Sequence, residues 1–114
     1  MIYLSNAFSL GMVNPSPSLT LRVRVASLEE VKDLLRGGFV SAVGHQATAE
    51  LLSTLLGLPV EANRVAITMG AGDALVVFQL RIRLQEGQIL SSQEVKSLYD
   101  QGLASFYLVE VLGQ

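Results

Sequence analysis

The residue best suited to acid–base chemistry in this chain is its only histidine, His45. Gly44 precedes it where a short apolar run gives way to a helical pattern, and a glycine there lets the backbone turn sharply. The free N–H groups and positive dipole end of the following helix would point toward whatever lies beside His45. Such a helix start is suited to an anion such as a phosphate. The imidazole is therefore a candidate general acid or base near neutral pH.

The simpler alternative is that His45 is a partly exposed residue at a helix start, hydrogen-bonded to nearby backbone. No Ser-His-Asp or Cys-His pattern accompanies it, so a nucleophile triad is unsupported. One histidine and no cysteine leave almost no ligands for a structural zinc site within one chain. We therefore expect neither a metal nor another cofactor.

A second group of candidate residues lies along a strand pattern that begins at residue 74. Arg81 and Arg83 alternate with apolar residues, so they share one strand face with Gln79. Arginines on such a face are usually solvated surface, but a guanidinium is also well shaped to bind two phosphate oxygens. Glu86 follows Arg83 by three residues and could pair with it, hold it in place or orient a nucleophilic hydroxyl.

Two further polar residues, Asn6 and Ser9, follow the first strand pattern. In a loop they could cap backbone groups, or they could hydrogen-bond a base edge or a ribose. The Gly70-Ala71-Gly72 run matches neither a Walker loop nor a dinucleotide fingerprint, so we interpret it as a turn.

Alternation and capping signals indicate the elements that would carry these residues. Strands are expected over residues 1–5, 19–25, 39–43, 64–68, 74–84 and 105–112, the fourth and fifth forming a hairpin through residues 70–73. Helices are expected from capping boxes at 27–30 and 91–94, and from His45 to Leu56. The pattern predicts an α/β domain with a mixed sheet of about five strands packed by about three helices.

Length and charge limit the class of protein. With 114 residues, half of them apolar, residues 1–114 are expected to form one domain. A net charge of −2 argues against a protein that coats DNA or RNA through a basic face, although two or three arginines could still hold a small anion. No segment resembles a signal peptide or a membrane span, so we expect a soluble, cytoplasmic protein without membrane contacts.

Several motifs together resemble one known family. They are Ala42-Val-Gly-His45-Gln-Ala-Thr48, Asn63-Arg64-Val65, Met69-Gly-Ala-Gly-Asp73-Ala-Leu75 and Arg83-Leu-Gln-Glu86-Gly87, with Tyr3-Leu-Ser-Asn6-Ala-Phe-Ser9 at the start and Gly102-Leu-Ala-Ser-Phe-Tyr107 near the end. This combination resembles the viral ring nuclease family, the type III anti-CRISPR proteins first seen in archaeal viruses. The resemblance covers nearly the whole chain.

The resemblance implies a homodimer whose two subunits bind one cyclic tetraadenylate ring across their interface and cleave it without a metal, silencing type III CRISPR signalling. A ribose 2′-hydroxyl would attack the adjacent phosphorus, leaving 2′,3′-cyclic or 3′-phosphate ends. His45 would protonate the departing 5′-oxygen, with Glu86 and Arg83 beside the scissile phosphate. Matching positions would supply the substrate contacts: Asn6, Ser9, Thr48, Arg64 and Gln79.

Two alternatives remain open beside this hypothesis. The first is a cyclic nucleotide binding module that sequesters the ring without cutting it. The second is a small dimeric interaction protein with no nucleotide ligand.

Overall fold

The computed structural model describes residues 1–14, 19–82 and 91–113. The elements in chain order are β1 (Ile2–Ser5), a 3-10 helix η1 (Leu10–Met12), β2 (Thr20–Ala26), α1 (Leu28–Arg36), β3 (Val40–Ser41), α2 (Gln46–Leu56), β4 (Ala74–Leu80), α3 (Ser92–Asp100) and β5 (Ala104–Gly113). The expected α/β architecture, a mixed five-stranded sheet with three α-helices, is confirmed. Within the described residues, no helix is long and apolar enough to cross a membrane.

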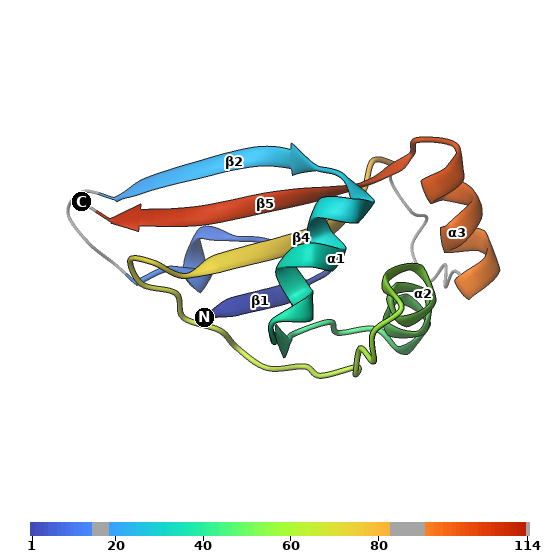
Figure 1. Ribbon diagram of the computed structural model, residues 1–114, viewed down its shortest axis with the longest axis horizontal. Helices are drawn as coiled ribbons and strands as arrows, with labels where there is room; N and C mark the ends of the chain where they lie inside the picture. The colour runs from blue at the N-terminus through green and yellow to red at the C-terminus, as the bar shows by residue number, and fades with distance from the viewer. Residues whose placement is uncertain (15–18, 83–90, 114) are drawn as a thin grey trace.

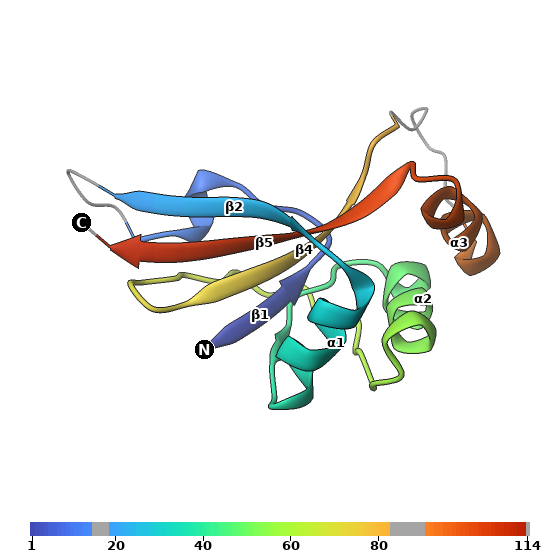
Figure 2. The ribbon, with the colours of Figure 1, turned by 45° about the horizontal axis from the view of Figure 1, so that its top comes forward.

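The strands lie side by side in the order β2-β5-β4-β1-β3 (Figure 1). β1 is parallel to both β3 and β4, whereas β5 is antiparallel to its neighbours β2 and β4. Figure 2 shows β5 running between β2 and β4, with α2 beside α3 beyond one end of the sheet. The carboxyl ends of β1, β3 and β4 therefore lie at the same end of the sheet.

The central strands β4 and β5 are buried on both faces, whereas the edge strand β2 is largely exposed. On the helix face, Val76 and Phe106 pack against residues of α1, α2 and α3, and Tyr99 of α3 stacks near Phe78 with ring centroids 6.3 Å apart. On the opposite face, which we call the loop face, Leu75 and Val109 pack under irregular segments around residues 8–14 and 65–69. This two-sided core explains why β4 reads as an almost unbroken apolar run.

The predicted hairpin is wrong, because residues 64–68 form no strand. Their alternation has another cause: Ile67 and Met69 are buried against the loop face, while the backbone pairs with the η1 segment. Met69 donates its N–H to the Met12 carbonyl at 2.7 Å and forms a single parallel bridge with Val13. The predicted strand 74–84 also ends earlier, at Leu80, and the predicted strand 39–43 has only two residues in β3.

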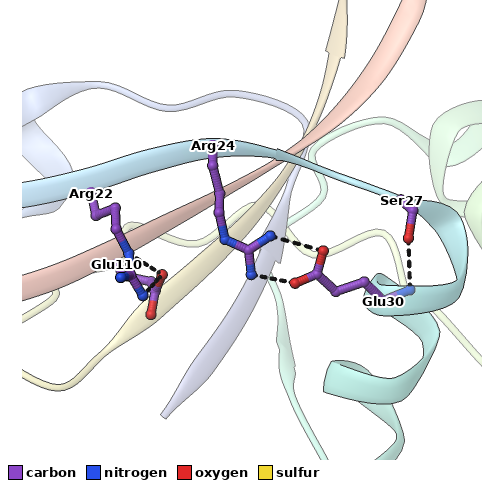
Figure 3. A network of polar contacts seen from close by, with 5 residues as sticks. All are labelled: Arg22, Arg24, Ser27, Glu30 and Glu110. Carbon is purple, nitrogen blue, oxygen red and sulfur yellow. Dashed lines mark hydrogen bonds and ion pairs between the residues drawn. The ribbon is translucent and has the colours of Figure 1, made fainter.

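The two predicted capping boxes differ in the structure. At α3 the box is complete, since Ser91 and Glu94 each bind the backbone N–H of the other. At α1, the Ser27 hydroxyl accepts from the Glu30 N–H at 3.2 Å, but the Glu30 carboxylate turns to Arg24 of β2 (Figure 3). The Arg24 guanidinium binds both Glu30 oxygens, so this pair ties α1 to the edge strand.

Candidate functional site

Polar side chains lie in the three chain segments that follow the carboxyl ends of the parallel strands. Asn6 follows β1, Gly44 and His45 follow β3, and Arg81 follows β4. β1 lies between β3 and β4; after β1 the chain packs on the loop face, whereas after β3 it enters α2 on the helix face. Such a position in an open α/β sheet is where ligands commonly bind.

His45 is the N-cap residue of α2, as the sequence predicts for a helix start. Its backbone is extended, with φ −128° and ψ 130°, and its carbonyl accepts the N–H of Ala49 at 3.0 Å. The imidazole is exposed and makes no capping hydrogen bond to the helix. The simpler alternative is a histidine hydrogen-bonded to nearby backbone. The imidazole does not make such a bond as a helix cap. Thr48 lies in the first turn of the same helix, half-buried.

Gly44 plays a different part from the one expected of it. Its φ is not positive, so the sharp turn that would require glycine is absent. What is special is that two side chains hold its backbone: the Gly44 N–H donates to Asn6 Oδ1 at 3.0 Å, and its carbonyl accepts from Arg64 Nε at 3.1 Å. A Cβ at Gly44 would lie 3.4 Å from Arg64 Cγ, so the guanidinium stem passes directly over it.

Arg64 is an exposed cation whose partner is neutral. Its hydrogen bond goes to a carbonyl, and no carboxylate in the described ranges lies within ion-pair distance of it. Arg22, Arg24 and Arg36, by contrast, each pair with a carboxylate. The charge of Arg64 is therefore not offset by an ion pair in the described part of the chain, next to a helix N-terminus that also favours anions.

A second polar cluster lies on the loop face where β4 ends. Arg81 donates from Nε to Ser105 Oγ and from Nη2 to Tyr107 Oη, both at 3.1 Å. Gln79 is exposed, lies opposite Ser105 in the β4–β5 register, and donates to the Leu80 carbonyl. The sequence predicts that Gln79 and Arg81 share a face, but Ser105 and Tyr107 were missed because their contribution depends on that register.

The structure brings together some of the predicted site residues and leaves others apart. Asn6 and Arg64 both bind Gly44, directly before His45, and Thr48 lies in the first turn of the helix that His45 caps. Ser9 is exposed at the start of η1, and within the described ranges no contact links its side chain to His45. Arg83 and Glu86 lie outside the described residues.

Asn63 is a further residue at the site to which the sequence assigns no role. Its side-chain amide donates to the Ser41 carbonyl at 2.8 Å, and its backbone N–H donates to the Val43 carbonyl at 2.7 Å. Its sequence signals are the Asn63-Arg64-Val65 motif and its place directly before residues 64–68, which the alternation pattern wrongly predicts to form a strand.

The chain is similar to proteins of archaeal viruses and to one bacterial protein, the uncharacterized protein YddF of Bacillus subtilis, which is 30% identical over 106 residues that cover 90% of this chain and 94% of that protein. The family model described as STIV B116-like matches residues 2–107. The structure of B116 of Sulfolobus turreted icosahedral virus superposes with a TM-score of 0.77 and 35% identity, covering 96% of this chain and 97% of that one. Uncharacterized protein 26 of Sulfolobus islandicus filamentous virus is 34% identical over 95 residues, which cover 82% of this chain and 80% of that protein. Uncharacterized protein ORF117 of Acidianus two-tailed virus is 39% identical over 88 residues, covering 75% and 74%.

Proposed function

The chain belongs to the STIV B116-like family, and on that premise we propose that it is a metal-independent phosphodiesterase that cleaves cyclic tetraadenylate. The observation that carries the proposal is the position of His45. Its exposed imidazole begins α2, one residue after the carbonyl that fixes Arg64 beside it. A proton donor, a cation and a helix N-terminus thus all lie next to Gly44. That combination suits a phosphodiester in which negative charge develops during cleavage.

The charges of the site support a phosphate ligand over a neutral one. Arg64 and Arg81 are exposed, and their hydrogen bonds go to a carbonyl and to two hydroxyls. Four other cations pair with carboxylates: Arg22, Arg24, Lys32 and Arg36. The cations without a carboxylate partner in the described ranges thus include Arg81, which follows β4, and Arg64, which binds the carbonyl of Gly44. A chain with net charge −2 still offers local positive potential there.

The proposed reaction is an internal transfer. The 2′-hydroxyl of one ribose attacks the adjacent phosphorus in line, the bond from phosphorus to the 5′-oxygen breaks, and a 2′,3′-cyclic phosphate forms. His45, as imidazolium, gives its proton to the departing 5′-oxygen, and the 2′-hydroxyl proton leaves to solvent or to the Glu86 carboxylate. Arg83 and the first turn of α2 stabilise the charge on the phosphoryl oxygens. Positioning of the hydroxyl supplies much of the acceleration.

We propose further that two copies of the chain form the complete site. Val23 and Val25 of β2 are 56% and 60% exposed, although valine favours a packed sheet surface. Val25 and Val77 both lie opposite Tyr107 in the register, so this apolar patch shares the loop face with the Arg81 cluster. A two-fold dimer through this face would present His45 and Arg81 twice to a ring of four similar nucleotides.

The test is incubation of the purified chain with cyclic tetraadenylate in excess chelator, followed by mass analysis of the products. Linear di-adenylates with 2′,3′-cyclic or 3′-phosphate ends are expected. The His45→Ala variant should bind the ring with nearly unchanged Kd but cleave it about 100 to 10,000 times more slowly. Wild-type turnover in that variant would contradict the assigned acid.

The same experiment separates the alternatives. Intact ring recovered in a tight complex with the wild-type chain would favour a binding module that sequesters the ring. Absence of both product and complex, with no thermal shift on addition of the ring, would contradict nucleotide binding altogether. Rings of three and six adenylates, tested in parallel, define the ring-size preference.

A further inference from the structure

We infer that Asn63 is a positioning residue that holds His45 and Arg64 in place relative to each other. The expected effect on kcat rests on the proposed function. The segment Ser41–Gly44 leads directly into His45, and each of its peptide groups has a partner. On the β1 side, the Ala42 N–H donates to the Leu4 carbonyl at 2.7 Å, and Ser5 Oγ donates to the Ala42 carbonyl at 3.3 Å.

The other side of this segment is held by residues 61–64. Ser41 Oγ donates to the Glu61 carbonyl at 2.6 Å, and Val43 forms a parallel bridge with Ala62. Asn63 then makes two bonds, from its backbone to the Val43 carbonyl and from its side chain to the Ser41 carbonyl. The carbonyls of alternate residues in an extended chain point the same way, so a single residue bridges both.

The Asn63 side chain therefore replaces a backbone donor that an irregular segment cannot supply. With Asn63 paired to both carbonyls, Arg64 follows in the register that lets its Nε reach the Gly44 carbonyl. The same carbonyls belong to the peptides that lead into His45. A shift of residues 61–64 would displace Arg64 and leave buried or half-buried carbonyls without partners, which the segment could relieve only by moving.

Asn63→Ala and Asn63→Ser test this inference, because both remove the amide donor while the backbone N–H remains. Ser keeps a small polar side chain and serves if the Ala variant does not fold. Asn14→Ala is the matched control: Asn14 is exposed and donates its backbone N–H to the Met69 carbonyl at 2.9 Å, beside the other isolated bridge. The single histidine allows its imidazole resonance to be assigned without ambiguity.

The expected result is a shift of the Gly44 amide and the His45 imidazole resonances in both Asn63 variants but not in Asn14→Ala. With cyclic tetraadenylate as substrate, kcat should fall about 10- to 100-fold, because a misplacement of about 1 Å can cost roughly a hundredfold. KM should change less than kcat, since Arg64 remains present. Thermal midpoints should stay within a few degrees of wild type.

Two results would overturn the inference. One is a pair of Asn63 variants with wild-type resonances at Gly44 and His45, and the other is moved resonances with wild-type kcat. A wild-type chain that leaves the ring intact contradicts the proposed function instead, and this is seen before any variant is measured. The resonance comparison still decides in that case whether Asn63 positions His45.

Discussion

Arg64 combines a free charge with a fixed position, because its Nε is held by the Gly44 carbonyl while no carboxylate in the described ranges offsets it. We expect Arg64→Ala to weaken binding of cyclic tetraadenylate about tenfold to a hundredfold, the range for loss of a charge-assisted hydrogen bond. Isothermal titration of the inactive His45→Ala background measures it. Arg36→Ala, which removes a cation paired with Asp33 on α1, is the control and should bind normally. Equal losses in both would indicate that only overall charge matters.

At the same scale, the sequence predicts single residues better than their contacts. His45 is recognisable as a helix start because apolar periodicity begins immediately after it. The bonds of Gly44 are not predictable: that to Asn6 depends on β1 and β3 lying side by side and joins residues 38 positions apart, and that to Arg64 joins residues 20 positions apart. Gly44 illustrates the difference: its place at the site comes from the two side chains that bind its N–H and its carbonyl, and a positive φ plays no part.

Among the elements, the contact between β2 and α1 should make the free energy of unfolding depend on pH. The hydrogen bond from Arg24 holds the pKa of Glu30 below its ordinary value near 4.5. A lowered pKa in the folded chain stabilises it at pH values above the unfolded pKa, and this contribution is lost as the pH falls through the folded pKa. Glu30→Gln should therefore lower the free energy of unfolding at pH 7 and lower it by less at pH 3.

Urea unfolding of both chains at the two pH values measures this difference. Glu29→Gln is the control, because Glu29 is 82% exposed and 3.8 Å from Lys32, so its removal should change stability less at pH 7. An equal loss for Glu30→Gln at both pH values would show that the Arg24 pair does not carry the effect.

Helices are the elements that the sequence predicts well, because their capping residues act locally: Ser91 and Glu94 form the complete box that begins α3. The prediction of a strand over residues 64–68 is wrong because strand pairing is not a local property. Their alternation reflects burial against the loop face, but a strand also needs a neighbour along its whole length, and the nearest bridge, at Met69, comes only after the segment ends. Local pattern indicates which side chains are buried, whereas pairing is settled by the rest of the fold.

At the scale of the whole molecule, the proposed dimer gives a test that joins assembly to activity. Val25→Glu should yield a monomer by analytical ultracentrifugation and lose ring cleavage, because a carboxylate would be buried in the interface. Its effect on the folded monomer should be small, since Val25 is 60% exposed. Leu112→Glu, at a residue 54% exposed near the end of β5, is the control and should remain dimeric. A fully active monomeric Val25→Glu chain would contradict a shared site.

The place of β5 between β2 and β4 has a consequence for how the protein is made. Residues 20–26 and 74–80 share no edge until residues 104–113 arrive to pair with both. Synthesis at about 5–20 residues per second separates β2 from its partner by several seconds. Throughout that interval, β2 of the nascent chain is unpaired and exposes two valines. The risk that this strand pairs with another chain therefore ends only when β5 leaves the ribosome.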